Sequence, residues 1–383
     1  MPARLNTRGL GKLRATLQSH IDRGRIPGAV ALIARAGQVE FCEALGRQDP
    51  QAGTAMRPDS IFRIYSMTKP VVSLAALMLM EDGELQMNQP LSLFLPEFAR
   101  PQVLVLENGA ERLVPAHREA TVHDLLRHTA GLTYEFLGDN PIQRRYKAVD
   151  IDSRSRTNRE LCKLLATMPL QDHPGTWFQY SRATDVLGAV VEVVSGRTLG
   201  QFLAERIFEP LGMKDTAFHV PRGHWDRIAE PFAKDPDSGE PVLMIEPREV
   251  PAYESGGGGL LGTAGDYARF LAMIRNRGSL EGVRLVSRKT VEWMTSDHLG
   301  NLPAYNELLI PGYGFGLGFA VRTHAGMAPQ PGSVGQYFWS GIGGTSFFVD
   351  PQEDVFAMLM TQAPNQRIFF RNVFRHLVYA ALD

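Results

Sequence analysis

The chain has 383 residues, 40 basic against 41 acidic side chains, and a formal net charge of -1. This length can bury a sizeable core in one large or two modest domains, and the balanced charge argues against nucleic acid or an anionic membrane as a partner. Cys42 and Cys162 have no metal or redox spacing. Residues 1–18 mix basic residues with leucines and contain no continuous apolar stretch, so they do not resemble a secretory signal and favour a cytoplasmic location.

The first 80 residues predict a helix, a hairpin and a second helix. Apolar residues at helical spacing predict an amphipathic helix over 7–22, which the Pro-Gly pair at 27–28 ends. Residues 29–35 and 38–45 have the composition of two strands joined by a short turn. The run 71–80 is apolar all round, which is typical of a buried helix, and it is too short to cross a bilayer.

Between residues 81 and 311 helical segments alternate with loops rich in proline, glycine and asparagine, and convincing strands are scarce. The helices are predicted over 122–128, 158–167, 184–195, 199–208 and 266–276. Residues 235–251 are polar and proline-rich, which indicates a surface loop. The glycine run 255–259 is not a phosphate loop, because no Gly-Lys-Ser/Thr follows it.

Strands return in the C-terminal part, which closes with a helix over residues 367–382. The strands are predicted over 315–321, 335–339, 345–349 and 355–360. A two-stranded hairpin is marginal alone, so we expect the N-terminal hairpin to join these strands in one antiparallel sheet covered by the first and last helices. Residues 1–80 and 312–383 then form a discontinuous sheet domain, 81–311 form a mostly helical insertion, and the active site lies in the cleft between them.

The residues from Ser66 to Lys69 (Ser-Met-Thr-Lys) are the first candidate for chemistry. Three residues apart on a helix, the two side chains share one face, and Pro70 fits only the first helical turn. Free backbone N–H groups at a helix N-terminus favour a developing anion, and a serine with an amine one turn on is a plausible activated nucleophile. By itself the pattern is weak, because a chain of this length contains roughly one Ser-x-x-Lys by chance.

Three more stretches strengthen the assignment of Ser66 and Lys69 as catalytic residues. They are His-Pro-Gly-Thr-Trp-Phe-Gln-Tyr-Ser at 173–181, Trp-Ser-Gly at 339–341 and Leu-Leu-Arg-His-Thr-Ala-Gly-Leu at 125–132. With Phe-Glu-Pro-Leu-Gly-Met at 208–213 and Gly-Gly-Thr at 343–345, the sequence resembles the superfamily of serine β-lactamases (class C type), penicillin-binding proteins and family VIII carboxylesterases almost end to end. The resemblance implies an α+β fold of the β-lactamase/transpeptidase type.

The resemblance also implies roles for individual residues. Ser66 would be the acylated nucleophile, Lys69 would remove or share its proton, and Tyr180 would act as general base in acylation and activate water in deacylation. Which of Lys69 and Tyr180 is the acylation base stays open. Both groups have unperturbed pKa values near 10, so burial and mutual coupling must shift these values before either group can act as a base. The backbone N–H groups of Ser66 and Ile342 would form the oxyanion hole.

Departures from the family pattern bear on the substrate. Where lactamases have Tyr-x-Asn, this chain has Arg182 in place of the asparagine, so the amide that grips a lactam side chain is missing. Where they have Lys-Thr-Gly, it has Trp339, Ser340 and Gly341, which loses a cation suited to the lactam carboxylate and resembles family VIII esterases. His-Ala-Gly at 324–326 is a lower-ranked rival for this element.

Further aromatic lining of the substrate site is expected from Tyr134, Phe136 and Trp177, which suits a small uncharged acyl ester. No Gly-x-Ser-x-Gly occurs, so an α/β-hydrolase is disfavoured. His123 and His128 lack metal-ligand spacing, and we expect neither a metal nor a cofactor.

We therefore expect a serine hydrolase that cleaves short-chain carboxylic esters, with weak β-lactam hydrolysis left open. An acyltransferase using the same acyl-enzyme is the alternative, followed by a β-lactamase or D-amino-acid peptidase. A non-enzymatic binding module is least favoured, because it would not need Ser66, Lys69 and Tyr180 together. Physiological substrate, acyl-chain length, stereoselectivity and oligomeric state are not indicated by the sequence.

Overall fold

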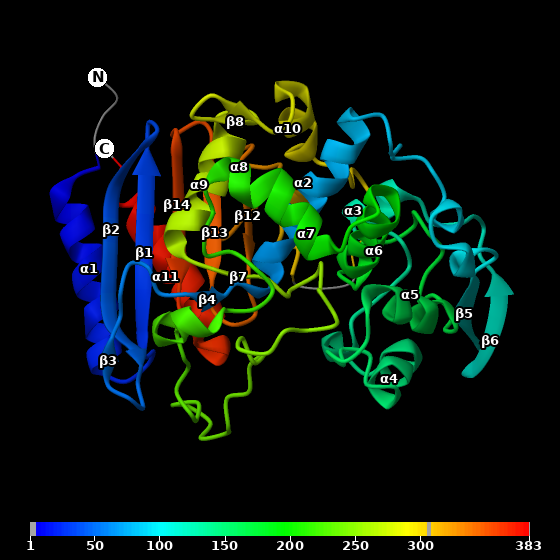
Figure 1. Cartoon of the computed structure of the whole chain (residues 1–383), viewed down its shortest axis with the longest axis horizontal. Helices are drawn as coiled ribbons and strands as arrows, with labels where there is room; N and C mark the ends of the chain where they lie inside the picture. Colours follow the sequence, from blue (N-terminus) through cyan, green and yellow to red (C-terminus); the bar gives the residue numbers. More distant parts are fainter. Residues whose placement is uncertain (1–4, 305–307, 383) are drawn as a thin grey trace.

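The computed structural model describes residues 5–304 and 308–382, and its central element is an eight-stranded antiparallel sheet (Figure 1). The strand order is β10-β11-β12-β13-β14-β1-β2-β3. β1 (Gly28–Arg35) pairs with β14 (Val355–Met360), with Val30 opposite Met360. The N-terminal hairpin therefore completes the C-terminal strands, as its inability to bury itself predicts.

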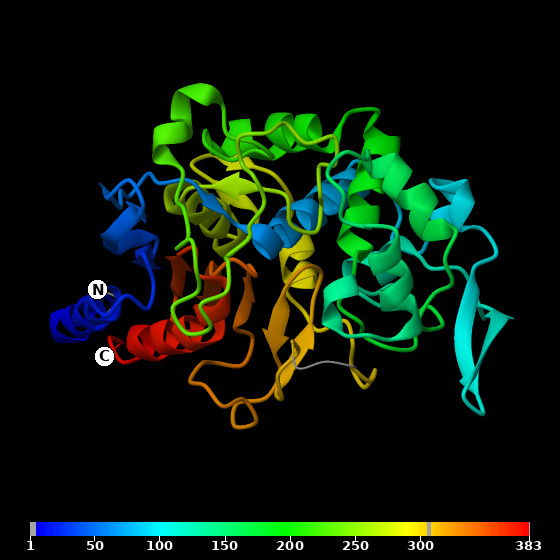
Figure 2. The same cartoon turned by 90° about the horizontal axis from the view of Figure 1, so that it is seen from below.

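The remaining strands of this sheet are β2 (Gln38–Asp49), β3 (Thr54–Ala55), β10 (Tyr313–Phe315), β11 (Ala320–Arg322), β12 (Tyr337–Ser340) and β13 (Ser346–Asp350). Helices α1 (Thr7–Asp22) and α11 (Arg367–Tyr379) lie side by side on one face, and α9 (Ala264–Arg275) contacts β1 and β14 on the other (Figure 2). Every residue of β1 is buried because both faces of the sheet are covered.

Helix α2 (Thr68–Glu81) runs through the middle of the molecule between the sheet and the helical region (Figures 1 and 2). The helical region contains α3 (Val122–Leu126), α4 (Pro141–Ala148), α5 (Asn158–Ala166), α6 (Ala183–Ser195) and α7 (Leu199–Leu203). The shorter elements are β4 (Phe62–Arg63), β5 (Gln102–Glu107), β6 (Ala110–Pro115), α8 (Glu209–Leu211), β7 (Leu261–Gly262), β8 (Ser279–Leu280), β9 (Val283–Arg284) and α10 (Arg288–Met294). The division into a sheet domain and an inserted domain stays a prediction.

The strand predicted over 315–321 is wrong. The structure has two short strands there, β10 and β11, paired with Tyr313 opposite Arg322. The turn between them contains Gly318 with φ +97°, where a Cβ would lie 2.8 Å from Ser73 Oγ and 3.1 Å from Pro70 Cα on α2. The chain turns because only a glycine can approach α2 this closely.

The expectation of few strands in the middle of the chain missed the β5–β6 hairpin. Asn108 and Gly109 form its turn, with φ +52° and +80°. Two consecutive positive φ values match the Asn-Gly two-residue turn, so a signal for this hairpin was present in the sequence. The helices α4 and α10 were also missed.

Among the described residues no single helix is long and apolar enough to span a bilayer. Two consecutive helical segments, 183–195 and 199–211, are long and apolar enough only when they are taken together, and the chain bends between them.

Candidate active site

Ser66 lies in a single 3₁₀ turn, Tyr65–Met67, that runs directly into α2. Tyr65 has φ +46°, a conformation that costs energy for a non-glycine residue and persists only where the surroundings hold it. The Ile245 N–H donates to the Tyr65 hydroxyl at 3.1 Å, and a Cβ at Gly343 would meet the Tyr65 ring at 2.7 Å. The strained residue is therefore held on both sides, immediately before the serine.

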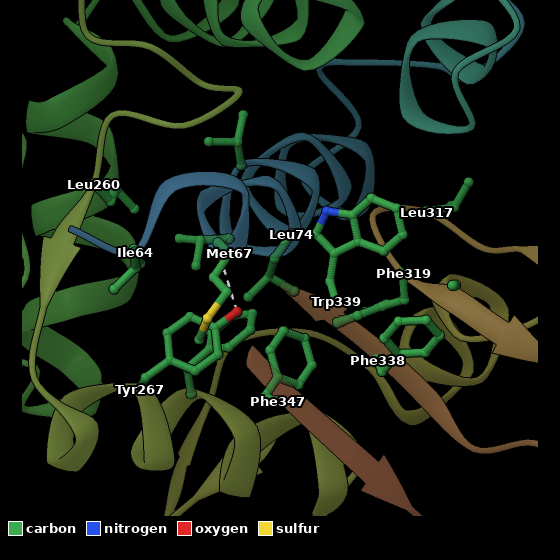
Figure 3. Close-up of a cluster of buried hydrophobic side chains, with 14 of the residues drawn as sticks. Ile64, Met67, Leu74, Leu260, Tyr267, Leu317, Phe319, Phe338, Trp339 and Phe347 are labelled. Carbon is green, nitrogen blue, oxygen red and sulfur yellow. Dashed lines mark hydrogen bonds between the residues drawn. The ribbon is translucent and has the colours of Figure 1, made fainter. Parts of the chain in front are cut away.

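The core beneath the turn holds it from below (Figure 3). The Tyr267 hydroxyl, from α9, donates to the Met67 carbonyl at 2.9 Å, and Phe347 packs against the same tyrosine. The Leu260 N–H donates to Thr68 Oγ1 at 3.1 Å on the next residue. These contacts fix the position of Ser66 from two different elements.

Lys69 is fully buried and has three close oxygen neighbours. Its Nζ lies 3.3 Å from Ser66 Oγ, 3.0 Å from the Tyr134 hydroxyl and 2.6 Å from the Gly257 carbonyl. Burial lowers the pKa of Lys69 to about 7, although the Asp185 carboxylate acts in the opposite direction. A neutral amine has two donors and one lone pair, so it can donate to Gly257 and Tyr134 while its lone pair accepts the Ser66 proton.

Tyr180 also lies close to the amine. Its ring centroid is 4.4 Å from Lys69 Nζ, and the indole N–H of Trp339 donates to its hydroxyl at 3.3 Å. Burial raises the pKa of Tyr180 well above its usual value, while hydrogen bonds with Ser66 and Trp339 act in the opposite direction. At neutral pH this side chain is therefore a phenol, and the amine is the more readily available base.

The Asp185 carboxylate holds Gly257, the residue whose carbonyl accepts a hydrogen bond from Lys69. Asp185 Oδ1 accepts hydrogen bonds from the Gly257 N–H at 2.8 Å and the Ser255 hydroxyl at 2.6 Å. The Gly257 peptide thus joins Asp185 on one side to Lys69 on the other. A Cβ at Gly257 would lie 2.6 Å from the Tyr134 oxygen and 2.7 Å from Asp185 Oδ2, so only glycine fits there.

Arg182 is the next charged residue of the site and lies close to Asp185. Its guanidinium pairs with Glu135 at 2.7 Å and lies 3.9 Å from Asp185. The arginine that replaces the family's asparagine is thus paired within the site, and after burial its positive charge also contributes to the lowered pKa of Lys69.

The cavity above these residues has a volume of about 610 Å³ and draws its walls from both ends of the chain. Its lining contains these site residues expected from the sequence: Ser66, Tyr134, Phe136, Tyr180, Arg182, Trp339, Ser340, Gly341 and Ile342. Buried Lys69 lies beneath this surface, and His324 of the rival element is not part of it.

The expectation that Trp177 lines the cavity is wrong. Its neighbour Phe178 donates its N–H to the Pro303 carbonyl at 2.8 Å, which ties this part of the loop to residues 303–304. Only at Tyr180 does the loop present a side chain to the cavity.

Ile342 lies at the top of a tight turn, as an oxyanion donor requires. Gly341 and Thr345 are hydrogen-bonded across the turn at 2.8 Å, and a Cβ at Gly341 would lie 2.5 Å from the Ile64 carbonyl. Within the described part of the chain the Ile342 N–H has no hydrogen-bond acceptor. It is therefore available to an oxygen of a bound substrate.

Sequence reasoning missed three contributions: Asp185, the Gly257 carbonyl and the Tyr134 hydroxyl as partners of Lys69. The glycine run 255–259 was the available signal, since a run that is no phosphate loop needs another reason for close backbone approach. In residues 5–304 and 308–382 no cluster of three or more His, Cys, Asp or Glu side chains is placed to hold a metal ion.

Known proteins resemble this chain over most of its length. A family model described as Beta-lactamase matches residues 13–380. Esterase EstB of Burkholderia gladioli is 36% identical over 374 residues, which cover 91% of this chain and 89% of EstB.

Two solved structures resemble the whole molecule. EstCE1, described as a hydrolase with promiscuous acyltransferase activity, matches with a TM-score of 0.80 and 30% identity over 98% of each chain. Simvastatin synthase (LovD) from Aspergillus terreus has a TM-score of 0.80 at 22% identity, over 97% of this chain and 98% of its own, and shows the fold alone.

Proposed function

The chain belongs to the Beta-lactamase family, and we propose that it is a serine carboxylesterase that cleaves short-chain esters through an acyl-Ser66 intermediate. The observation that carries this proposal is a serine hydroxyl 3.3 Å from a buried amine whose pKa is lowered to about 7. The aromatic cavity and the esterase relatives EstB and EstCE1 support an ester as the substrate.

In the first half-reaction neutral Lys69 takes the Ser66 proton while Oγ bonds to the ester carbonyl carbon. The carbonyl electron pair moves to oxygen, where the N–H groups of Ser66 and Ile342 stabilise it. When the intermediate collapses, the carbon–alkoxide bond breaks, the Tyr180 phenol gives its proton to the leaving oxygen, and Lys69 returns a proton to Tyr180. In the second half-reaction water takes the place of the serine hydroxyl: Lys69 accepts its proton while its oxygen bonds to the acyl carbon. The bond to Ser66 Oγ then breaks, Oγ receives the Tyr180 proton, and the acid is released.

The pH dependence of activity follows from the lowered pKa of Lys69. Since the neutral amine is the active form, kcat/KM for p-nitrophenyl butyrate should rise with pH through about 7 and then level off. Initial rates across the neutral range test this. If a Tyr180 phenolate were the base, the rate would still be rising well above pH 9, because burial raises the pKa of that phenol.

The test of the proposed function is turnover of p-nitrophenyl butyrate with nitrocefin run alongside. Mass spectrometry of acid-quenched enzyme should show one butyryl group on the peptide that contains Ser66. Fast nitrocefin turnover with slow ester turnover would make the protein a β-lactamase instead. Absence of both turnover and adduct would reject an acyl-enzyme.

Acyl transfer is the second candidate, because EstCE1 is described with that activity and a cavity of about 610 Å³ has room for an acceptor alcohol beside the acyl group. Both functions use the same acyl-Ser66. The ratio of butyl butyrate to butyric acid formed with added butanol separates them.

The cytoplasmic location remains a proposal from the sequence, which cell fractionation tests.

A further inference from the structure

Asp185 is a buried carboxylate in the first turn of α6 that contacts Lys69 through Gly257. Its Oδ1 accepts the Gly257 N–H at 2.8 Å and the Ser255 hydroxyl at 2.6 Å. The Gly257 carbonyl in turn accepts a hydrogen bond from Lys69 Nζ at 2.6 Å. The carboxylate therefore fixes the segment to which the amine is bound.

This segment lies between α6 and the turn that carries Ser66. A Cβ at Gly256 would clash with the Thr184 carbonyl on α6, and a Cβ at Gly258 would be in contact with the Tyr65 backbone at 3.7 Å. The segment is thus pressed against the helix at the residue before Asp185 and against the residue before Ser66. A change in the hydrogen bonds of Asp185 would therefore move the carbonyl that holds Lys69.

Other ionisable groups face Lys69 and Asp185, but near pH 7 they are neutral or paired. Burial raises the pKa of the phenols and the thiol and lowers the pKa of the imidazole in this set: His128, Tyr134, Cys162, Tyr180 and Tyr253. Arg182 pairs with Glu135 at 2.7 Å and lies 3.9 Å from Asp185. The charges that act on Lys69 are therefore those of Asp185 and Arg182.

These two charges have opposite effects on the amine. Burial lowers the pKa of Lys69 to about 7, the Asp185 charge opposes this effect, and the Arg182 charge adds to it. Without Asp185 the pKa of Lys69 would fall further, and a base works best when its pKa lies near the operating pH. The carboxylate thus keeps the amine basic enough to accept the Ser66 proton.

We propose that Asp185 is a positioning residue, which holds Gly257 against Lys69, places a negative charge behind the amine and thereby sets the pH range in which Ser66 reacts. In this role Asp185 acts through Lys69 and not on the substrate. The proposal rests on the proposed acyl-Ser66 chemistry and adds a determinant of its pH dependence.

A purely structural role is the competing explanation. Asp185 would then stabilise the fold through Ser255 and Gly257, and its removal would lower Tm and activity without changing the pH at which the rate rises. A positioning role changes that pH, because the protonation of Lys69 determines it. The pH profile therefore separates the two roles.

Two substitutions separate charge from position. Asp185→Asn removes the charge and keeps an oxygen that can accept from Gly257 and Ser255. The midpoint of the rise in kcat/KM for p-nitrophenyl butyrate should move about one pH unit below that of wild type, and the plateau should fall roughly threefold to tenfold because the base is weaker. Asp185→Ala also loses the hydrogen bonds, so its midpoint should move in the same direction and its plateau should fall roughly tenfold to a hundredfold. Circular dichroism identifies the folded variants, and either one alone decides the direction of the shift.

Phosphonylation of Ser66 keeps the test independent of ester turnover. With an alkyl fluorophosphonate, Ser66 Oγ bonds to phosphorus, fluoride leaves, and the serine proton passes to Lys69. Mass spectrometry of the modified protein gives the rate at each pH, which should rise through about 7 in wild type and through a lower pH in Asp185→Asn. A shifted phosphonylation profile without any ester turnover supports the role of Asp185 and rejects the esterase function.

Glu254→Gln is the matched control, because Glu254 precedes Ser255 and its carboxylate also accepts a backbone N–H, that of Gly200 at 2.7 Å. Its charge is not one of those that act on Lys69, so its midpoint should equal that of wild type. An unchanged or raised midpoint in a folded Asp185 variant, or an equal fall in Glu254→Gln, overturns the role of Asp185 while the esterase function stands. Wild type that reacts with neither the ester nor the fluorophosphonate at any pH overturns both.

Discussion

Replacing Ser66 by alanine should lower kcat/KM for p-nitrophenyl butyrate by roughly four to six orders of magnitude, the range seen when a serine nucleophile is removed. The hydroxyl is the atom that would form the acyl bond, and Lys69 would then have no proton to accept from position 66. The backbone of the turn is held through Tyr65, Met67 and Thr68, so the variant should fold normally. The butyryl adduct should disappear from the mass spectrum together with turnover.

Ser73→Ala is the matched control, because Ser73 is a buried serine on α2, the helix that follows the Ser66 turn directly. It should keep activity within a few-fold of wild type. A Ser66→Ala variant that still turns over and still carries the adduct would place the nucleophile elsewhere. The Tyr134 hydroxyl, 3.0 Å from Lys69 Nζ, would then be the next candidate.

The parts of the site that depend on local spacing could be predicted from the sequence. Ser66 and Lys69 are one helical turn apart, and that spacing alone places their side chains together. The contacts that tune Lys69 are of another kind, since Tyr134 is 65 positions and Gly257 is 188 positions away along the chain. No periodicity connects residues so far apart, and their approach to Lys69 depends on how distant segments fold around α2.

The C-terminal helix α11 also shows what an apolar pattern predicts and what it does not. Its apolar period predicts that Phe370, Val373, Phe374, Leu377 and Val378 point inward. Of these, Phe370, Phe374 and Val378 are buried, and Val373 and Leu377 are partly buried. Arg375 is also buried, with its guanidinium 4.4 Å from the centroid of the Phe338 ring on β12. A pattern of apolar residues treats every arginine as a surface residue, so this burial could not be predicted.

Replacing Lys69 by methionine should lower kcat/KM by roughly two to four orders of magnitude, the range for loss of a general base. Methionine fills a similar volume but has no lone pair basic enough to accept the Ser66 proton. The rise of activity through pH 7 should vanish from any residual rate, because the group that titrates there is gone. Residual activity with an unchanged pH profile would assign the base to another residue.

The same variant should have nearly the stability of wild type at pH 7. The pKa of Lys69 falls from 10.5 to about 7 on folding, so between these values the unfolded chain binds a proton that the folded chain does not. Lys69 therefore weakens the fold as pH falls from 10.5 to about 7, on the order of 4 kcal/mol at the lower end. Methionine removes this penalty, while the Gly257 carbonyl and the Tyr134 hydroxyl each lose a partner at about 1–3 kcal/mol. The two effects are of similar size, so calorimetry should find Tm at pH 7 close to that of wild type, and above pH 10 the variant should become the less stable of the two. A variant with a much lower Tm at pH 7 would show that Lys69 stabilises the fold, contrary to the lowered pKa on which its role as a base depends.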